Sequence, residues 1–328
     1  MPPITRRALL TALGGLGGAA LCGCTTRHPS PPPVDGTAIA ESATPAPVPD
    51  VVVTTATGPV TVPGAPLRVV TLDTAELDSA LTLGITPVGS ARPAADPSFP
   101  DYWPASRLAP IAAVGATGDP DLAAIRALRP DLILSNQSRD GGRYEALRAI
   151  APTVLTQTTG APWKANVQTH AQALSRQDAA AAFAASYQRH VNQVVTALGN
   201  ARTGGRKVSL VRFVEGGGIR LYGKQSFPGS VLTDAQVGRP DAQNVDQGDM
   251  EIPADQLAKA DGDLLLYATY GDPDRAGTTA ALASPAWQAL GAVRAHRAFP
   301  VDDQLWFQGI GYTGANYVLT ELQHFLGA

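Results

Sequence analysis

The sequence predicts an α/β protein of two Rossmann-like lobes, each a mainly parallel sheet flanked by helices, joined by one long backbone helix. Three observations support this prediction. Short apolar runs alternate with helical patterns, one sequence pattern (the repeated phrase) occurs twice, and a long helical segment with an apolar stripe separates its two copies. We expect the N-terminal lobe over residues 51–176, the connecting helix over 177–200 and the C-terminal lobe over 201–328.

The predicted strands are short aliphatic runs without polar alternation. Such runs are typical of strands that are buried on both faces of a parallel sheet. They are residues 69–72, 132–134, 154–155, 208–211 and 264–266. Helical stretches lie between them, which favours parallel pairing through helical crossovers.

The repeated phrase places an aspartate at the start of one strand in each lobe. Asp131 and Asp263 each follow an apolar residue by six positions and open an apolar strand. A similar helical segment then begins at Tyr144 in the first copy and at Trp287 in the second. The second copy carries 11 additional residues around 272–284. The matching second halves favour duplication of a lobe over a chance likeness of helix–strand units.

The connecting helix is predicted from one continuous apolar stripe over residues 178–198. Its members are Phe183, Tyr187, Val191, Val194 and Leu198. This spacing follows the helical period. Two similar lobes joined by one stiff helix leave a cleft between them, and ligand sites favour such clefts.

The first 23 residues resemble a secretory signal peptide. Arg6 and Arg7 precede an apolar stretch, and the stretch ends in Leu21-Cys22-Gly23-Cys24. Paired arginines are typical of twin-arginine signals, and the ending resembles a bacterial lipobox. We expect cleavage before Cys24 and acylation of that cysteine, with palmitate among the acyl chains; an ordinary signal cut by the general peptidase is the alternative.

Residues 24–50 are rich in proline, serine, threonine and alanine, which is typical of a semi-extended spacer. The expected location is therefore the outer face of the cytoplasmic membrane, with the folded part attached only through the lipid. The mature chain, without Arg6 and Arg7, carries a formal net charge of −5 and no basic run. This composition argues against a nucleic-acid partner, and we expect a monomer.

The sequence contains no motif that predicts an enzyme, a metal site or an intrinsic cofactor. Residues 309–314 (GIGYTG) fit the dinucleotide-binding pattern, but only 14 residues follow them and those predict a terminal helix. The second strand and acidic residue that the pattern needs have no room. None of the five histidines forms a close pair, and the lone cysteine of the mature chain is Cys24.

Aromatic and arginine residues next to predicted strands are the candidate ligand contacts. Trp306 lies on a strand-to-helix loop, Arg212 ends a strand, Arg92 lies in a loop, and Trp103 stands beside Tyr102 between two prolines. Taken alone, each fits a structural role equally well. Together they predict a cleft for a large, flat, anionic ligand.

Four segments resemble the helical-backbone substrate-binding lipoproteins of ABC importers for ferric siderophores, haem and cobalamin. They are residues 68–89, 114–134, 220–240 and 283–322. The resemblance implies a ferric siderophore or haem as ligand and an ABC permease as partner. It implies a siderophore contact at Trp306, further contacts at Asn136 and Gln137 after the 132–134 strand, and one at Tyr222 in the third segment.

The chain departs from this family pattern in both lobes. Ala116-Thr117 stands where hydroxamate binders often carry an arginine, and Gln247 where they carry a second tryptophan. The family docks on its permease through one acid per lobe, which Asp255 matches and Ala123 does not. An envelope interaction protein that keeps the fold without delivering cargo is therefore the alternative to an importer component.

Overall fold

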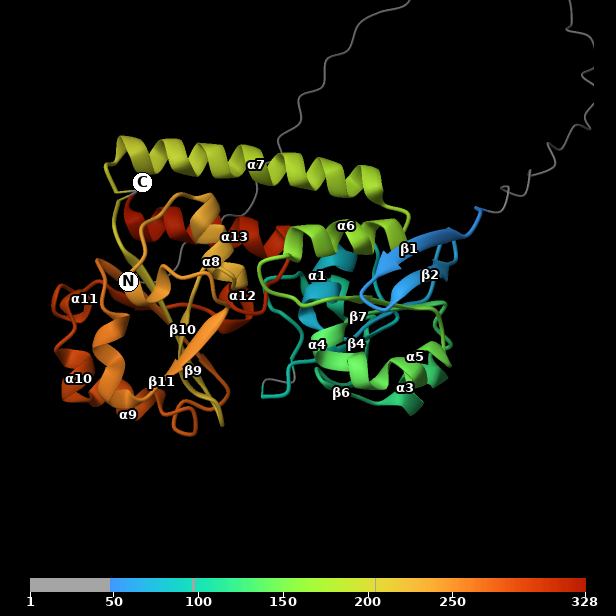
Figure 1. Ribbon diagram of the computed structural model, residues 1–328, viewed down its shortest axis with the longest axis horizontal. Helices are drawn as coiled ribbons and strands as arrows, with labels where there is room; N and C mark the ends of the chain where they lie inside the picture. Colours follow the sequence, from blue (N-terminus) through green and yellow to red (C-terminus); the bar gives the residue numbers. More distant parts are fainter. Residues whose placement is uncertain (1–47, 96–97, 204) are drawn as a thin grey trace, which may run out of the picture. The chain divides into compact units, whose positions relative to one another are not determined.

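The computed structural model of the chain describes residues 48–95, 98–203 and 205–328. The predicted signal peptide, Cys24 and the spacer up to residue 47 lie outside the described residues. Within the described part, two sheets with their helices form two lobes, and α7 (Gln177–Asn200) runs along both of them (Figure 1). No helix of that part has the length and apolar character needed to cross a membrane.

The N-terminal lobe contains a six-stranded sheet in the order β6-β5-β4-β3-β7-β8. Every pairing is parallel except β5 with β6. The strands are β3 (Val69–Thr71), β4 (Gly89–Arg92), β5 (Ala112–Ala116), β6 (Asp119–Pro120), β7 (Leu132–Asn136) and β8 (Thr153–Thr156). The helices are α1 (Thr74–Thr82), α2 (Ala105–Leu108), α3 (Leu122–Ala127), α4 (Gln137–Asp140), α5 (Tyr144–Arg148) and α6 (Trp163–Ala173), with a 3₁₀ turn at Gly141–Arg143. A hairpin of β1 (Val51–Thr55) and β2 (Gly58–Val62), which the sequence did not predict, precedes this sheet.

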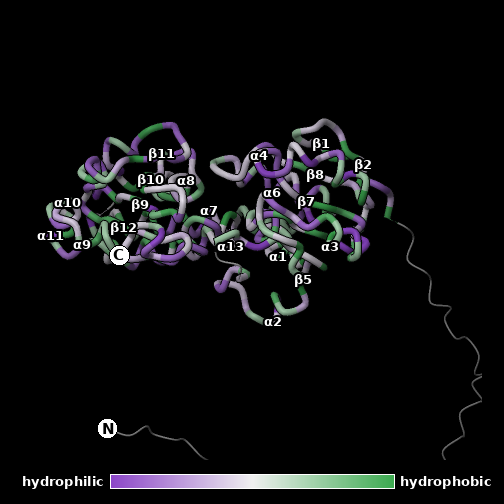
Figure 2. Tube along the Cα trace, turned by 90° about the horizontal axis from the view of Figure 1, so that it is seen from below, coloured by the Kyte–Doolittle hydropathy of each residue, from purple (hydrophilic) through white to green (hydrophobic). Residues whose placement is uncertain are grey.

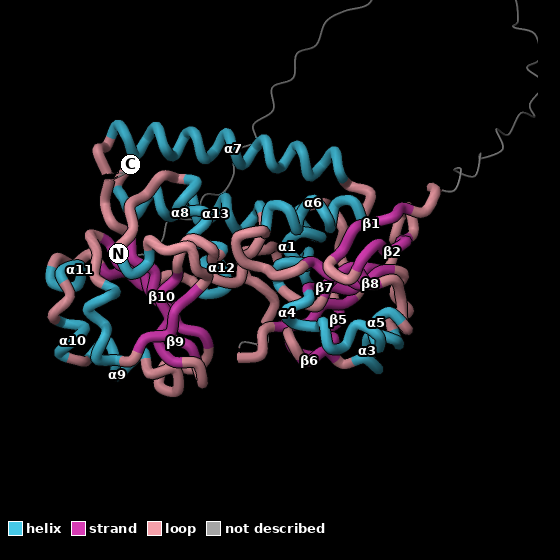
Figure 3. Tube along the Cα trace, in the orientation of Figure 1, coloured by secondary structure: helices cyan, strands magenta, loops and turns pink. Residues whose placement is uncertain are grey.

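The C-terminal lobe contains a five-stranded sheet in the order β11-β10-β9-β12-β13. Its parallel part is β9 (Val208–Val214), β12 (Leu264–Tyr270) and β13 (Ala298–Pro300). The antiparallel strands β10 (Gly218–Tyr222) and β11 (Asp249–Ile252) extend it. The helices are α8 (Phe227–Asp234), α9 (Thr278–Ala283), α10 (Pro285–Gln288), α11 (Gly291–Arg294), α12 (Asp303–Trp306) and α13 (Tyr312–Leu326), with 3₁₀ helices η2 (Asp241–Gln243) and η3 (Ala254–Ala260). The predicted α/β class with parallel-strand sheets is confirmed, and Figure 3 shows helices around both sheets.

The repeated phrase has a structural counterpart in hydrogen bonds. Both Asp131 carboxylate oxygens accept backbone N–H groups just before β3, from Leu67 at 2.8 Å and Arg68 at 2.9 Å. Asp263 accepts the N–H of Lys207, just before β9, at 2.8 Å. Each aspartate therefore ties its own strand to the strand that pairs with it, β7 to β3 and β12 to β9. The additional residues around 272–284 form a turn and α9.

The lobes share one hydrophobic core. Figure 2 shows the elements of the two lobes in separate groups, with α7 and α13 between them. Trp163 from α6 packs edge-on against Tyr187 of α7, Phe227 of α8 and Tyr312 of α13. The predicted stripe on α7 is buried except for Phe183, which is 37% exposed. Packing of side chains therefore joins the lobes, in addition to the connecting helix.

The glycines of residues 309–314 allow close packing where the lobes meet. A Cβ atom on Gly311 would overlap the carboxylate of Asp78, and one on Gly314 would overlap the carbonyl of Gly309. Asp78, buried on α1, accepts the hydroxyl of Tyr102 at 3.0 Å and the N–H of Gly314 in α13 at 3.4 Å. Burial raises the pKa of Asp78 to about 6. This glycine segment is thus a packing feature, as the rejection of a dinucleotide site implied.

Candidate functional site

A cavity of about 270 Å³ between the lobes contains residues of both sheets. We call it the cleft. Its lining residues are Asp73, Thr74, Pro93, Ala94, Thr117 and Arg139 from the N-terminal lobe, and Arg212, Val214, Arg220, Tyr270, Phe307, Gln308 and Ile310 from the C-terminal lobe. Many of them follow or end the strands β3, β5, β7 and β12, and open α/β sheets bind ligands at these carboxyl ends.

Arg212 is held in place on the C-terminal side of the cleft. Its Nε and Nη2 atoms each donate to a different carboxylate oxygen of Asp303 at 2.6 Å. The guanidinium lies over the rings of Tyr270, at 4.7 Å, and Phe307, at 5.2 Å. Both side chains of this ion pair are largely buried, at 15% and 10% exposed. Arg212 therefore presents a fixed planar group and retains its own counter-ion.

Arg139 and Arg220 are held less tightly than Arg212. Arg139 contacts Asp73 through Nε alone, at 3.1 Å, and its side chain is 51% exposed. Arg220 contacts Asp249 through Nη1 at 3.0 Å, and both side chains are more than a third exposed. The exposed pair of Arg220 contributes about 0–1 kcal/mol, so Arg220 can exchange partners at low cost. Arg139 is itself exposed, but its partner Asp73 is buried at 6% exposure. The Asp73 carboxylate also accepts the N–H of Thr74 and lies within reach of the Asn136 side-chain nitrogen, so it keeps other donors when Arg139 turns away.

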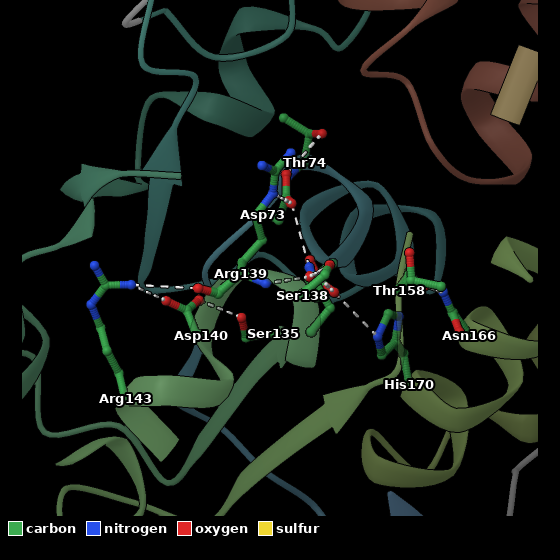
Figure 4. Close-up of polar contacts among 12 residues, drawn as sticks. Asp73, Thr74, Ser135, Ser138, Arg139, Asp140, Arg143, Thr158, Asn166 and His170 are labelled. Carbon is green, nitrogen blue, oxygen red and sulfur yellow. Dashed lines mark hydrogen bonds and ion pairs between the residues drawn. The ribbon is translucent and has the colours of Figure 1, made fainter. Parts of the chain in front are cut away.

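The buried side chain of Asn136 fixes the start of the short helix that carries Arg139. It is fully buried, and its side-chain oxygen accepts the Ser138 hydroxyl at 2.7 Å and the N–H of Arg139 at 3.1 Å. These bonds cap the N-terminus of the short helix α4, and Figure 4 shows Arg139 reaching from that helix to Asp73. Asp73 in turn accepts the N–H of Thr74 at 2.7 Å as the N-cap of α1.

Four other cavities of the described residues are larger than the cleft, and the two largest differ from it in their lining. One, of about 540 Å³, is lined by the carboxylates of Asp101, Asp302 and Asp303, and these would repel an anion. The other, of about 590 Å³, is an apolar groove between η3, α9 and α10 of the C-terminal lobe. Unlike these two cavities, the cleft has arginines of both lobes and aromatic rings in its lining.

Two of the predicted ligand contacts lie at the cleft. Arg212 lines it directly. Tyr222 lies beside Arg212, with its ring centroid 4.6 Å from that of Phe307 and its hydroxyl 3.4 Å from Arg212 Nη1. Burial raises the pKa of Tyr222, so it remains a neutral phenol.

The structure places the side chain of Trp306 in the core. Its side chain is fully buried, and its Nε1 donates to Glu321 of α13 at 2.5 Å. The next residue of the same loop, Phe307, lines the cleft instead. The short helix α12 turns Trp306 toward the core, because consecutive residues of a helix point in different directions.

The other predicted contacts lie outside the cleft lining. Asn136 is buried as a helix cap, and Gln137 is exposed on the outside of α4. Arg92 ends β4 with its guanidinium 4.7 Å from the Phe99 ring. Trp103 packs on the small core cluster beside α1, where Arg107 covers its ring.

The sequence interpretation missed Arg139, Arg220 and Tyr270. Arg139 could have been found: it lies three residues after Asn136, so a capped helix at this strand end presents it to the cleft. Tyr270 ends β12, the strand that the second copy opens. Arg220 lies on an antiparallel strand that the apolar pattern did not indicate.

The family model described as "Periplasmic binding protein" matches residues 69–305. This chain belongs to that family. Members and solved neighbours are binding proteins, in agreement with the prediction that the chain is not an enzyme.

Two curated relatives and one solved structure illustrate this membership. The chain is 31% identical to the "Probable siderophore-binding lipoprotein YfiY" of Bacillus subtilis (strain 168), over 80% of this chain and 83% of the relative. It is 28% identical to the "Fe(3+)-citrate-binding protein YfmC" of the same organism, over 77% and 79%. The structure of SirA complexed with staphyloferrin B, from Staphylococcus aureus, matches with a TM-score of 0.75 and 25% identity, over 84% of this chain and 98% of that one.

Proposed function

We propose that this chain captures an anionic ferric chelate, such as a ferric siderophore or ferric citrate, and delivers it to an ABC permease for import. The observation that carries the proposal is the cleft, whose lining includes Arg139 from the N-terminal lobe and Arg220 and Arg212 from the C-terminal lobe. The names of YfiY, YfmC and SirA support iron chelates as the ligand class.

The charges of the cleft suit an anion that exchanges with resident carboxylates. Arg220 is paired through an exposed contact to Asp249, and the exposed Arg139 through one contact to the buried Asp73. A chelate with two or more carboxylates can therefore bond both guanidinium groups, while Asp73 keeps the N–H of Thr74 as a donor. The Tyr270 and Phe307 rings supply apolar surface next to the arginines. A cationic chelate would meet three arginines and bind poorly.

The test is quenching of tryptophan fluorescence by a panel of ferric compounds. We expect ferric citrate or ferri-bacillibactin, both anionic, to bind at least about 100-fold more tightly than ferrioxamine B, which is cationic. The affinity of the bound chelate should fall as salt is raised, because the contacts are between charges. Tightest binding of ferrioxamine B would overturn the anionic class, and absence of binding by the whole panel would overturn chelate capture.

We further propose that Cys24 carries the lipid that anchors the protein at the outer face of the cytoplasmic membrane. The signal-like sequence before Cys24 supports this, as does the word lipoprotein in the name of YfiY. A Cys24→Ala variant is expected to leave the membrane fraction and to bind the same chelate. Retention of a processed Cys24→Ala chain in washed membranes would contradict the anchor.

The alternative function, an envelope interaction protein without cargo, rests on the asymmetry of two surface positions. Asp255 is exposed on η3 and fits the proposed permease contact, whereas the corresponding N-terminal position, on α3, is the exposed Ala123. This alternative predicts that the chain does not associate with an ABC permease, whether or not it binds a ferric compound. Binding of the chain to its permease therefore distinguishes the two functions.

A further inference from the structure

A buried carboxylic acid, Glu76, lies beneath the arginine-bearing wall of the cleft, on the first turn of α1. Its side chain has no solvent exposure. The side-chain nitrogen of Asn136 lies 3.4 Å from Glu76 Oε1 and 3.4 Å from Asp73 Oδ2, so it bridges the two acids. Asp73 is the residue that pairs with Arg139 at the cleft surface. Glu76 is thus connected to the cleft arginine Arg139 through two side chains, those of Asn136 and Asp73.

The charged and titratable groups around Glu76 come from three helices. Asp73 caps its own helix, Arg139 and Asp140 belong to α4, and His170 belongs to α6 (Figure 4). His170 Nε2 lies 3.9 Å from Glu76 Oε1, which is beyond hydrogen-bond distance. Neither this nitrogen nor Glu76 Oε2 has a hydrogen-bond partner in the described structure. Asp78, further along α1, contacts α13 instead.

Both buried groups are neutral near pH 7. Burial, with the nearby charge of Asp73, raises the pKa of Glu76 to about 8. Burial lowers the pKa of His170 to about 3, so the imidazole supplies no positive charge to offset an ionised Glu76. Ionisation of Glu76 therefore adds an uncompensated negative charge beneath Asp73.

We propose that Glu76 is a proton-binding positioning residue that controls how firmly Arg139 is held by the cleft wall. In its neutral form, Glu76 leaves Asp73 as the single counter-ion of Arg139, and Arg139 can turn to an anionic chelate. In its ionised form, Glu76 adds a second negative charge near the Arg139 guanidinium. This charge holds Arg139 more firmly beside Asp73 and repels the anionic chelate. This inference rests on the proposed function, since it concerns an anion in the cleft.

Coupling between the two sites is reciprocal. If ionisation of Glu76 weakens chelate binding, then chelate binding must raise the proton affinity of Glu76 by the same factor. If chelate binding raises the pKa of Glu76 by about one unit, the affinity for the chelate falls about fivefold between pH 7 and pH 9. Binding at pH 8.5 then takes up about half a proton per chain. A merely structural role for Glu76 gives neither effect.

The experiment is calorimetric titration of the full chain with ferric citrate, and with ferri-bacillibactin as a second probe, in pairs of buffers of different ionisation enthalpy. Wild type is expected to take up protons at pH 8.5. The E76Q variant is expected to take up none and to change its affinity less than about twofold between pH 7 and 9. The matched control Glu145→Gln, at an exposed acid on α5, should retain the wild-type profile.

Three outcomes are informative. Binding by wild type without proton uptake, or an unchanged pH profile in E76Q, overturns the coupling and leaves the proposed function intact. Absence of binding by both probes overturns the proposed function itself. If E76Q fails to fold, infrared spectroscopy of the wild-type protein tests the proposal instead. Loss of a protonated-carboxyl band between pH 7 and 9, and its return on chelate binding at pH 8.5, support the proposal. An unchanged band contradicts it.

Discussion

Replacement of Trp306 with alanine is expected to lower the free energy of unfolding by about 3–5 kcal/mol, the usual cost of removing a fully buried large aromatic side chain. Trp306 is 0% exposed, packs beside Phe325 and donates to Glu321. The affinity of the folded protein for its ferric chelate should change less than about twofold, because Phe307 and not Trp306 lines the cleft. Urea denaturation and chelate titration measure the two quantities.

A Trp306→Phe variant is the matched control for this prediction. It keeps most of the buried apolar surface and loses the bond to Glu321, so its unfolding free energy should lie between those of wild type and Trp306→Ala. Unchanged stability of Trp306→Ala together with a tenfold loss of affinity would return Trp306 to the ligand site.

Neutralising the two exposed arginines of the cleft is expected to have the largest effect on affinity. Arg139→Gln and Arg220→Gln should each weaken binding of an anionic ferric chelate about tenfold, the effect of losing one charge-assisted hydrogen bond. The two residues lie on different lobes and have different partners, so the double variant should lose about 100-fold.

The control for the arginine series is Arg148→Gln. Arg148 is exposed on α5 and pairs with Glu145, away from the cleft lining. Its replacement should leave the affinity for the chelate unchanged. That result would show that loss of a surface charge anywhere on the protein does not explain the weaker binding of the cleft variants. Wild-type affinity in the Arg139→Gln, Arg220→Gln double variant would remove both arginines from the ligand site.

The fold could be predicted where one physical pattern dominates. The strands β3, β7, β9 and β12 are buried on both faces, so their sequences are nearly uninterrupted aliphatic runs. The stripe on α7 is visible because the helix packs on one side only. The strand β11 lies at the sheet edge and β10 lies between it and β9, and most of their residues are exposed or half-buried. Short, partly exposed runs of this kind are weak signals.

The site could be predicted less well, because the direction of a side chain depends on local turns. The sequence indicated aromatic and arginine residues at strand ends, and of these Arg212 lines the cleft. The local turns at two short helices determine which of the other side chains line the cleft. Asn136 begins α4 and thereby presents Arg139, whereas α12 buries Trp306 and presents Phe307. The cap at Asn136 could have been recognised from the sequence, whereas the short helix α12 has too few residues to show a helical period.

The most direct test of anion capture in the cleft is the position of iron in crystals of the protein grown with ferric citrate or ferri-bacillibactin. Anomalous scattering at the iron absorption edge locates the metal without assumptions about the chelate. We predict one iron peak between the lobes, with chelate oxygens bonded to Arg139 and Arg220 and the chelate against Tyr270. An iron peak in the apolar groove between η3 and α10, with the cleft free of chelate, would contradict this assignment.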